Sequence, residues 1–307
     1  MSTNTNLENF ISYSTNRFSW ENDVIIIAGP TAVGKSKIAI DLAKSINGVI
    51  INADSVQVYK DLNILSARPN KITIETIEHC LYGYVSSSTN FSVANWLSDL
   101  NDILVEIKKK QKIPILVGGS GLYISAAVNG LAPIPNILQK IKDESNLKFN
   151  QIGLESFKEL VSQIDPIFTH KNLDKHRLIR AYSVFKQTNK NLTFWYSQPR
   201  IGKIDKKVFS ILISSERAII YKNCDLRFNQ MLGNKAIEEV IKLRNKNINR
   251  DFPIMKSLGV KWLLSFLDGS ISYDYAVELS MRDTRNYAKR QMTWLRHNYI
   301  PQITIKL

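Results

Sequence analysis

Cysteine and histidine are scarce in this chain of 307 residues, which contains two cysteines and four histidines. Cys80 and Cys224 are too few for a disulfide framework or a zinc set, and the histidines show no metal-ligand spacing. No apolar run approaches the length of a membrane span. The first twenty residues lack the apolar segment of a signal peptide and the basic character of a transit peptide. These absences predict a cytosolic protein with no membrane partner.

The first part of the chain has no net charge, although the whole chain carries a formal net charge of +14. Residues 1–130 hold 11 basic and 11 acidic side chains, whereas residues 131–307 hold 30 and 16. A neutral half joined to a basic half is typical of a protein that binds a small anionic substrate and a polyanion. A composition that simply drifted basic is the alternative, but drift should act on both halves.

The strongest motif lies between an apolar β-branched run at residues 24–28 and an apolar helical pattern at residues 38–43. It fits the spacing G-x-x-x-x-G-K-[ST] of a phosphate loop. The loop consists of Gly29, Pro30, Thr31, Ala32, Val33, Gly34, Lys35 and Ser36. Backbone N–H groups, the helix start and the lysine of such a loop bind phosphate oxygens, and its serine can hold Mg²⁺. The motif therefore predicts di- or triphosphate binding, with Ser36 as metal ligand and Mg²⁺ as cofactor.

Two later strands are also expected to end at chemically useful residues. Residues 49–55 predict a strand with the acid Asp54 at its end, and residues 113–117 predict another that runs into the glycine corner before Ser120. In parallel α/β sheets, ligands lie beyond the carboxyl ends of the strands, so Asp54 is expected beside the phosphate loop. No Asp follows the strand at 113–117, so the Walker B aspartate of many ATPases is absent there.

Composition predicts how the chain is divided. A breaker cluster at residues 131–135 is followed by helical periodicity over residues 137–195, and a strand returns at residues 208–213. Amphipathic helices are expected at residues 216–246 and 274–297. The predicted fold class is α/β, with a P-loop NTPase-like parallel sheet, a helical insertion and a helical C-terminal part. The expected divisions are a loose tail at 1–22, a core at 23–132 and 206–307, and the insertion at 133–205.

Taken together, these motifs resemble the tRNA dimethylallyltransferases over nearly the whole chain. The resemblance is carried, in order, by residues 29–36, 54–60, 66–69, 118–123, 176–181 and 284–296. It implies transfer of a dimethylallyl group from dimethylallyl diphosphate to N6 of the adenosine immediately 3′ of the anticodon. The implied partners are dimethylallyl diphosphate and the anticodon stem-loop of tRNA, and a monomer is expected.

The resemblance also implies residue roles. Asp54 matches the position of the family's catalytic carboxylate. It would accept the proton of the adenine amine as general base. Ser120 matches a hydroxyl at the bridging diphosphate oxygen, and Arg217 would help Lys35 to hold the leaving diphosphate. The expected tRNA-binding residues are Asp54, Ser55, Val56, Gln57, Ser120, Lys142, His176, Arg177, Leu178, Ile179, Arg180, Lys256, Lys261, Arg285, Lys289, Arg290 and Arg296.

Several positions depart from the family pattern, among them Phe194 and Trp195, which stand where the family usually has a more polar helix. Lys142 stands where the family often has arginine, which exchanges a bidentate phosphate clamp for a point charge. Val260 stands where a tyrosine is common, so a stacking or hydroxyl contact is in doubt. Arg68 replaces the usual lysine and keeps its charge. None of these changes removes a group expected to take part in catalysis.

Three other functions fit parts of the sequence. A prenyltransferase for free adenine nucleotides would share the phosphate loop and Asp54 but would not need the basic second half. A small-molecule P-loop kinase conflicts with the missing acid after Val117. A non-catalytic RNA-binding protein would gain nothing from Asp54, because an unpaired carboxylate repels RNA.

Overall fold

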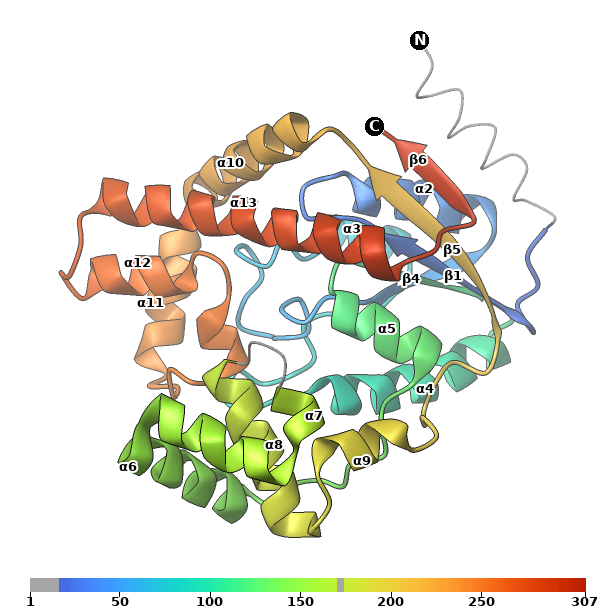
Figure 1. Ribbon diagram of the computed structural model, residues 1–307. Coiled ribbons are helices and arrows are strands. Elements are labelled where there is room, and N and C mark those ends of the chain that lie inside the picture. Colours follow the sequence, from blue (N-terminus) through green and yellow to red (C-terminus); the bar gives the residue numbers. More distant parts are fainter. Residues whose placement is uncertain (1–16, 170–173) are drawn as a thin grey trace. The chain divides into compact units, whose positions relative to one another are not determined.

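The computed structural model describes residues 17–169 and 174–307 (Figure 1). The chain forms two compact units. The first unit comprises the chain up to Val128 and from Ile204 onward, and the second comprises Asn129–Lys203. The second unit is thus inserted into the sequence of the first.

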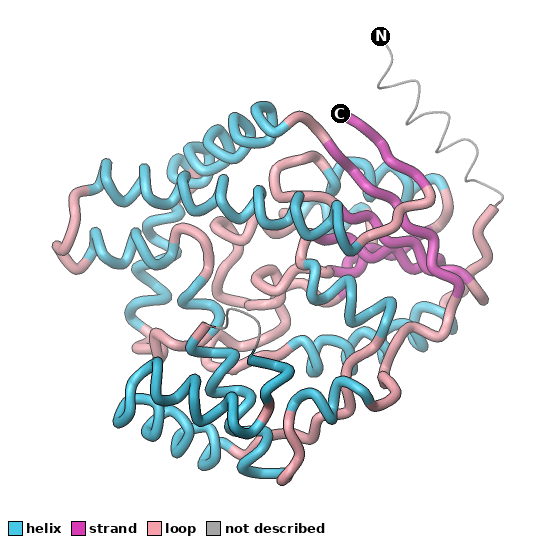
Figure 2. Tube along the Cα trace, in the orientation of Figure 1, coloured by secondary structure: helices cyan, strands magenta, loops and turns pink. Residues whose placement is uncertain are grey.

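A parallel sheet forms the centre of the first unit, in the order β3-β2-β4-β1-β5-β6 (Figure 2). Its strands are β1 Asp23–Ala28, β2 Gly48–Asn52, β3 His79–Cys80, β4 Ile113–Gly118, β5 Lys207–Ser214 and β6 Ile303–Lys306. Ile25 of β1 lies opposite Ile115 of β4 on one side and Phe209 of β5 on the other. The central strands are continuous apolar runs because both faces of a parallel sheet are buried.

Helices enclose this sheet and form the rest of the first unit. They are α2 Lys35–Ser45, α3 Lys71–Thr76, α4 Val93–Lys109, α5 Gly121–Asn129, α10 Arg217–Gly233, α11 Ala236–Asn245, the 3-10 helix η1 Pro253–Lys256, α12 Val260–Leu267 and α13 Tyr273–Asn298. Ile38 and Leu42 of α2 belong to the same buried cluster as Ile25 and Ile27 of β1. The long helix α13 runs beside α10 in Figure 1 and contributes Ala288 to that cluster.

The helical stretch expected at residues 216–246 is divided in two. Helix α10 ends at Gly233, and α11 begins at Ala236 after a short turn. Lys235 has a φ of 69°, in the left-handed region that interrupts a helix. The apolar periodicity continues across the turn, which is why the sequence pattern alone predicts one helix.

The second unit is helical. It contains α6 Gln139–Ile164, α7 Pro166–Thr169, α8 Lys175–Thr188 and α9 Leu192–Ser197. Helix α6 is kinked at Gly153, where φ is 78°. Phe157 and Val161 of α6 pack with Leu178 and Val184 of α8 in a separate apolar core. This helical insertion and the parallel sheet of the first unit confirm the predicted fold class.

Part of the segment expected to be a loose tail is packed. Phe18 meets Phe209 edge to face with ring centroids 5.0 Å apart, and Trp20 also packs against the core. The prediction of a loose tail up to residue 22 is therefore wrong for residues 18–22, because two aromatic side chains anchor them. Residues 1–16 lie outside the described residues.

The sheet order brings four loops to one edge of the first unit. Because β1, β2, β4 and β5 are parallel, their carboxyl ends point the same way. The phosphate loop follows β1, Asp54 follows β2 and Ser120 follows β4. Arg217 follows β5 as the first residue of α10. The fold therefore collects the main predicted site residues at the edge where ligands bind in α/β proteins.

Candidate active site

The phosphate loop connects β1 directly to α2. Gly34 has a φ of 96°, and a Cβ on Gly29 would lie 2.6 Å from the carbonyl oxygen of Ile213, so both positions require glycine. Gly29, Pro30 and Val33 are buried, whereas the side chains between and after them reach a cavity. Helix α2 begins at Lys35, so its N-terminal dipole adds to the anion-binding character of the loop.

A cavity of about 440 Å³ lies against this loop. Lys35, Ser36 and Asp54 all line it, together with Gln57, Arg227 and Gln291. The carboxylate and the phosphate-loop lysine therefore share one cavity on the same edge of the sheet. Its lining is largely polar and includes both signs of charge, as needed by a site that holds an anion and moves a proton.

The Lys35 ammonium lies inside the loop and donates a hydrogen bond of 2.7 Å to the Pro30 carbonyl. Burial, followed by the nearby Arg227 charge, lowers its pKa from 10.5 to about 7, although Asp54 and Cys224 act in the opposite direction. Lys35 is thus close to the balance between charged and neutral forms near neutral pH. A bound anion would favour the charged form.

Proton uptake on ligand binding is the resulting prediction. At pH 8, Lys35 of the free protein is mostly neutral, and diphosphate raises its pKa, so binding should take up close to one proton. Isothermal titration calorimetry in buffers of different ionisation enthalpy measures this number. Lys35→Met should abolish most of the uptake; equal heats in all buffers at pH 8 for the unaltered protein would contradict the prediction.

Asp54 is held at the end of β2 by its neighbours. Its backbone N–H donates to Oδ1 of the buried Asn52, whose amide in turn donates to the carbonyls of Asp54 and Leu81. The Asp54 carboxylate accepts the N–H of Val56 at 2.9 Å. The backbone on both sides of Asp54 is therefore fixed, and the side chain is directed into the cavity.

Ser120 lies beside the Asp54 loop and is connected to α13. Its Oγ accepts the N–H of Ser55 at 3.2 Å, and the Tyr287 hydroxyl is hydrogen-bonded to Ser120 and Gln291. Burial, followed by the nearby Asp54 charge, raises the pKa of Tyr287 to about 12, so its hydroxyl stays protonated. Ser120 itself is buried, and its neighbour Gly119 lines the cavity.

Gln291 of α13 joins the phosphate loop to the glycine corner after β4. Its Oε1 accepts the N–H of Thr31 at 2.8 Å, and its Nε2 donates to the Gly119 carbonyl at 2.9 Å. A Cβ on Gly119 would lie 2.3 Å from Nε2, so this close approach requires glycine. The motif at residues 284–296 thus contributes a structural link inside the site as well as surface cations.

Loss of this link should be measurable. Gln291→Leu keeps the size of the side chain but leaves the half-buried N–H of Thr31 and the buried carbonyl of Gly119 without these partners. Each backbone group that loses its partner costs about 1–3 kcal/mol. The free energy of unfolding should therefore fall by at least about 1–3 kcal/mol, and diphosphate should bind less tightly. Urea unfolding and a diphosphate titration measure both. Unchanged stability would show that the link is dispensable.

Arg227 is the site residue that sequence patterns missed. Its guanidinium donates a hydrogen bond to Thr31 Oγ1 and lines the cavity, and burial lowers its pKa. No ion pair within the described parts of the chain includes it. The available signal was a polar stripe on α10, because Asn223, Arg227 and Gln230 recur at helical spacing and all line the cavity.

Arg217, expected at the leaving group, is placed differently. It is exposed at the first position of α10 and is not among the residues that line the cavity. Ten residues of helix separate it from Arg227, about 15 Å of rise. The geometry therefore favours Arg227 over Arg217 as the cation of α10 at the diphosphate.

The predicted tRNA-binding residues of the first unit fall into two groups. Gln57 lines the cavity next to Asp54, and Ser55 and Val56 are half-buried beside it. The surface cations are Lys256, Lys261, Lys289, Arg290 and Arg296, all exposed. A shallow surface hollow of about 570 Å³ on α13 includes Lys289, Arg290 and Trp294.

Arg285 does not belong to this surface group. Its guanidinium contacts both carboxylate oxygens of Asp225, at 2.7 and 2.8 Å. The pair joins α13 to α10 and neutralises the charge that was predicted to meet tRNA. Arg285 is therefore better described as an interhelical contact.

In the second unit, two of the predicted residues face inward. Leu178 and Ile179 are buried in the apolar core of that unit, so their side chains are not available to an RNA. His176, Arg177 and Arg180 are exposed on the same helix α8, and Lys142 is half-buried on α6. The helical period therefore divides the motif at residues 176–181 into an RNA-accessible face and a core face.

The described residues contain neither a metal-ligand cluster nor a membrane-spanning helix. Within residues 17–169 and 174–307, no three His, Cys, Asp or Glu side chains lie close enough together to bind a metal ion. Nor does any helix in these ranges have the length and apolar character needed to cross a membrane.

Comparisons with known proteins found a matching family model and similar sequences. Residues 57–298 match the family model described as IPP transferase. The chain is 39% identical over 280 residues to the tRNA dimethylallyltransferase of Ehrlichia chaffeensis, covering 91% of this chain and 92% of the relative. It is 40% identical over 278 residues to that of Pelagibacter ubique, covering 90% and 89%.

Solved structures show the same likeness in three dimensions. A tRNA isopentenylpyrophosphate transferase from Bacillus halodurans is 29% identical, with a TM-score of 0.68 over 93% of this chain and 90% of its own. A eukaryotic dimethylallyltransferase acting on tRNA is 25% identical, with a TM-score of 0.76 over 89% of this chain and 70% of its own.

Proposed function

The chain belongs to the IPP transferase family, and we propose that it transfers a dimethylallyl group from dimethylallyl diphosphate to N6 of the adenosine immediately 3′ of the tRNA anticodon. It is an enzyme of the prenyltransferase class. The proposal is carried by one observation, the shared cavity of Asp54 and Lys35 at the carboxyl edge of the sheet. We expect it to act as a monomer in the cytoplasm.

Asp54 is the proposed general base. The adenine N6 lone pair is delocalised into the ring, so the amine is a poor nucleophile until its proton is removed. As N6 bonds to the allylic carbon, the carbon–oxygen bond to diphosphate breaks and the Asp54 carboxylate accepts the N6 proton. The hydrogen bonds around Asn52 and Val56 support this role because they fix the backbone that carries the carboxylate.

The phosphate loop and two cations are proposed to hold the leaving diphosphate. Residues of the loop and of the first turn of α2 line the cavity, and Lys35 and Arg227 bring positive charge to it. Negative charge grows on the bridging oxygen as the bond breaks, and preorganised donors stabilise that charge. Ser120, next to Tyr287, is the proposed hydroxyl near the bridging oxygen.

Mg²⁺ is the proposed cofactor, and the donor set fits it. The Ser36 hydroxyl is exposed at the start of α2, and diphosphate oxygens would supply most of the remaining ligands. Mg²⁺ is commonly held in this way, with few protein ligands and several phosphate oxygens or waters. When bound, it would neutralise part of the diphosphate charge.

The tRNA is proposed to contact the surface cations named above. Lys256, Lys261, Lys289, Arg290 and Arg296 would meet its phosphates in the first unit, and Lys142, His176, Arg177 and Arg180 in the second. Such contacts hold and position an RNA without reading its sequence. Asp54 to Gln57 and Ser120 would meet the target base in the cavity, which requires that base to leave its stack.

Incubation with dimethylallyl diphosphate, Mg²⁺ and an unmodified anticodon stem-loop tests the function. Mass spectrometry should detect one dimethylallyl group on the adenosine 3′ of the anticodon. Competition between AMP and the stem-loop distinguishes an enzyme for free nucleotides, which would prefer AMP. A folded protein that leaves the stem-loop unmodified would refute the proposal, and ATP turnover with a small acceptor would favour the kinase alternative.

A further inference from the structure

The loop at residues 60–68, here called the platform loop, lines the cavity through Ser66 and Ala67, beside Gln57. The Gln57 side-chain amide donates to the carbonyls of Ser66 and Ala67, at 2.8 and 3.1 Å. Because both partners are acceptors, Nε2 must face them, and both of its hydrogens are used. Gln57 therefore offers its remaining polar atom, the acceptor Oε1, on a residue that lines the cavity.

Glu239 of α11 holds the middle of the platform loop. One carboxylate oxygen accepts the N–H of Asn63 and of Ile64, the latter at 2.8 Å, and the other accepts the N–H of Leu65 at 2.9 Å. Three successive backbone N–H groups thus point at one side chain that lies about 175 residues further along the chain. Without it, the loop would lose these three contacts at once.

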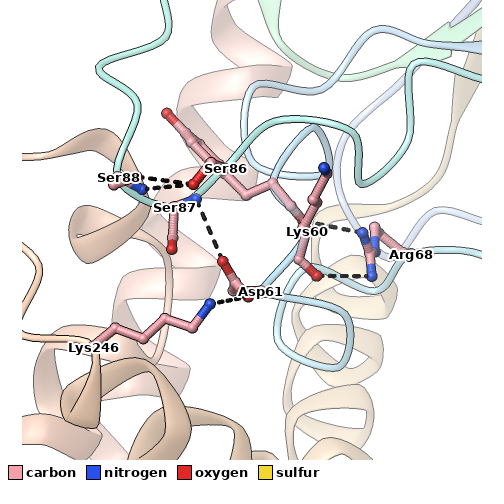
Figure 3. A network of polar contacts seen from close by, with 8 residues as sticks. Lys60, Asp61, Arg68, Ser86, Ser87, Ser88 and Lys246 are labelled. Atoms are coloured by element: carbon pink, nitrogen blue, oxygen red, sulfur yellow. Dashed lines mark hydrogen bonds and ion pairs between the residues drawn. The ribbon is translucent and has the colours of Figure 1, made fainter.

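Arg68 closes the platform loop from within. It donates to the carbonyl of Lys60 at 3.2 Å, as Figure 3 shows. It also donates to the carbonyl of Tyr59 at 3.0 Å and to Oδ1 of Asn63 at 3.1 Å. A Cβ on Gly83 would lie 1.5 Å from the guanidinium, so this position requires glycine. The motif at residues 66–69 therefore contributes a structural brace, and the Arg68 charge is used inside the loop.

Asp61 fixes the start of the platform loop. Its carboxylate accepts a 2.6 Å hydrogen bond from Lys246 Nζ and a longer one from the N–H of Ser87, and Figure 3 shows Asp61 between these partners. Burial pushes the pKa of Asp61 upward, but these hydrogen bonds outweigh it and hold the pKa below its usual value. Lys246 directly follows α11, so the α11 region holds the loop at two places.

We propose that Glu239 is a positioning residue: through the platform loop it orients Gln57 so that Oε1 accepts one hydrogen of the adenine amine while Asp54 takes the other. This inference rests on the proposed function. The amine carries two hydrogens, and only one is transferred. An acceptor fixed on the second hydrogen would hold the amine in place and would disfavour a base with a carbonyl oxygen there, because two acceptors would then face each other.

A double-mutant cycle tests the proposal. Single-turnover prenylation of the stem-loop and the Kd of dimethylallyl diphosphate are measured for Gln57→Ala, Glu239→Ala and the double variant. Each single variant should lower prenylation by about tenfold, the value of one lost hydrogen bond to a buried group. The double variant should be no slower than Gln57→Ala, and the diphosphate Kd should stay within about twofold throughout.

Glu238→Ala is the matched control. It removes the same charge from the adjacent position of α11, and among the described residues its carboxylate makes no hydrogen bond to the platform loop. Glu239→Gln, which keeps one acceptor oxygen, should lie between Glu239→Ala and the unaltered protein, and it replaces Glu239→Ala if that variant does not fold.

Multiplicative losses in the double variant would show a general structural effect and overturn the proposal. So would a Glu239→Ala rate equal to that of Glu238→Ala. Failure of the proposed function is distinguishable, because the unaltered protein would then leave the stem-loop unmodified. In that case, hydrogen exchange of the amides of residues 63–65 tests whether Glu239 holds the platform loop. Exchange should accelerate in Glu239→Ala but not in Glu238→Ala.

Discussion

Asp54→Asn should lower the rate of prenyl transfer by about 10²–10⁴-fold, the range for loss of a well-placed general base. The asparagine side chain has the same shape and can still accept the N–H of Val56, but it cannot take a proton at neutral pH. Diphosphate and stem-loop should bind within a few fold of their normal affinities. Single-turnover kinetics with both substrates saturating separates this loss of chemistry from any change in binding.

Asp102→Asn, on the exposed face of α4, controls for the change in net charge and should leave the rate unchanged. A purely RNA-binding protein makes the opposite prediction for Asp54→Asn. Removal of a carboxylate that repels RNA would then tighten binding, and there would be no prenyl transfer to lose. Tighter RNA binding without any change in turnover would therefore contradict the assignment of Asp54 as base.

Arg227→Met should be the second most damaging change, lowering the rate by about 10²–10³-fold, the cost of one lost donor at a site of developing charge. Methionine fills similar space without the charge. The guanidinium is half-buried, contacts Thr31 in the phosphate loop and lines the cavity. The diphosphate Kd should also rise, because part of the same contact exists in the ground state.

Arg217→Met, on the same helix, is the informative comparison. Arg217 is exposed and outside the cavity lining, so a small effect is expected. The variant with the larger loss of rate identifies the cation of α10 that binds the diphosphate. A large loss in Arg217→Met with a small loss in Arg227→Met would reverse the assignment made from the geometry.

The strands that build the site could be predicted because each is a local pattern. Residues 24–28, 49–52, 113–117 and 208–213 are apolar runs of strand length, and the structure places a strand at each. The sequence did not reveal β3 and β6, because two and four residues carry too little periodicity. The phosphate loop and Asp54 were found because their positions follow from the ends of predicted strands.

The rest of the site could not be predicted because it depends on how helices pack. Arg227 and Gln291 reach the cavity only because α10 and α13 present particular faces to the sheet edge. A motif assigns a function to a whole segment, but helical rotation divides the segment. Leu178 thus lies in a core, and Arg285 is paired with Asp225. Conversely, Glu239 belongs to no motif, and only the structure shows that it binds the platform loop.

The most direct test of the account is a crystal structure with Mg²⁺ and an unreactive dimethylallyl diphosphate analogue whose bridging oxygen is replaced by sulfur. We expect the diphosphate on the phosphate-loop amides, in contact with Lys35 and Arg227. We also expect the allylic carbon about 4–6 Å from the Asp54 carboxylate, a separation that leaves room for one amine nitrogen in reach of both. A diphosphate bound elsewhere, or an Asp54 carboxylate turned away from the allylic carbon, would contradict it.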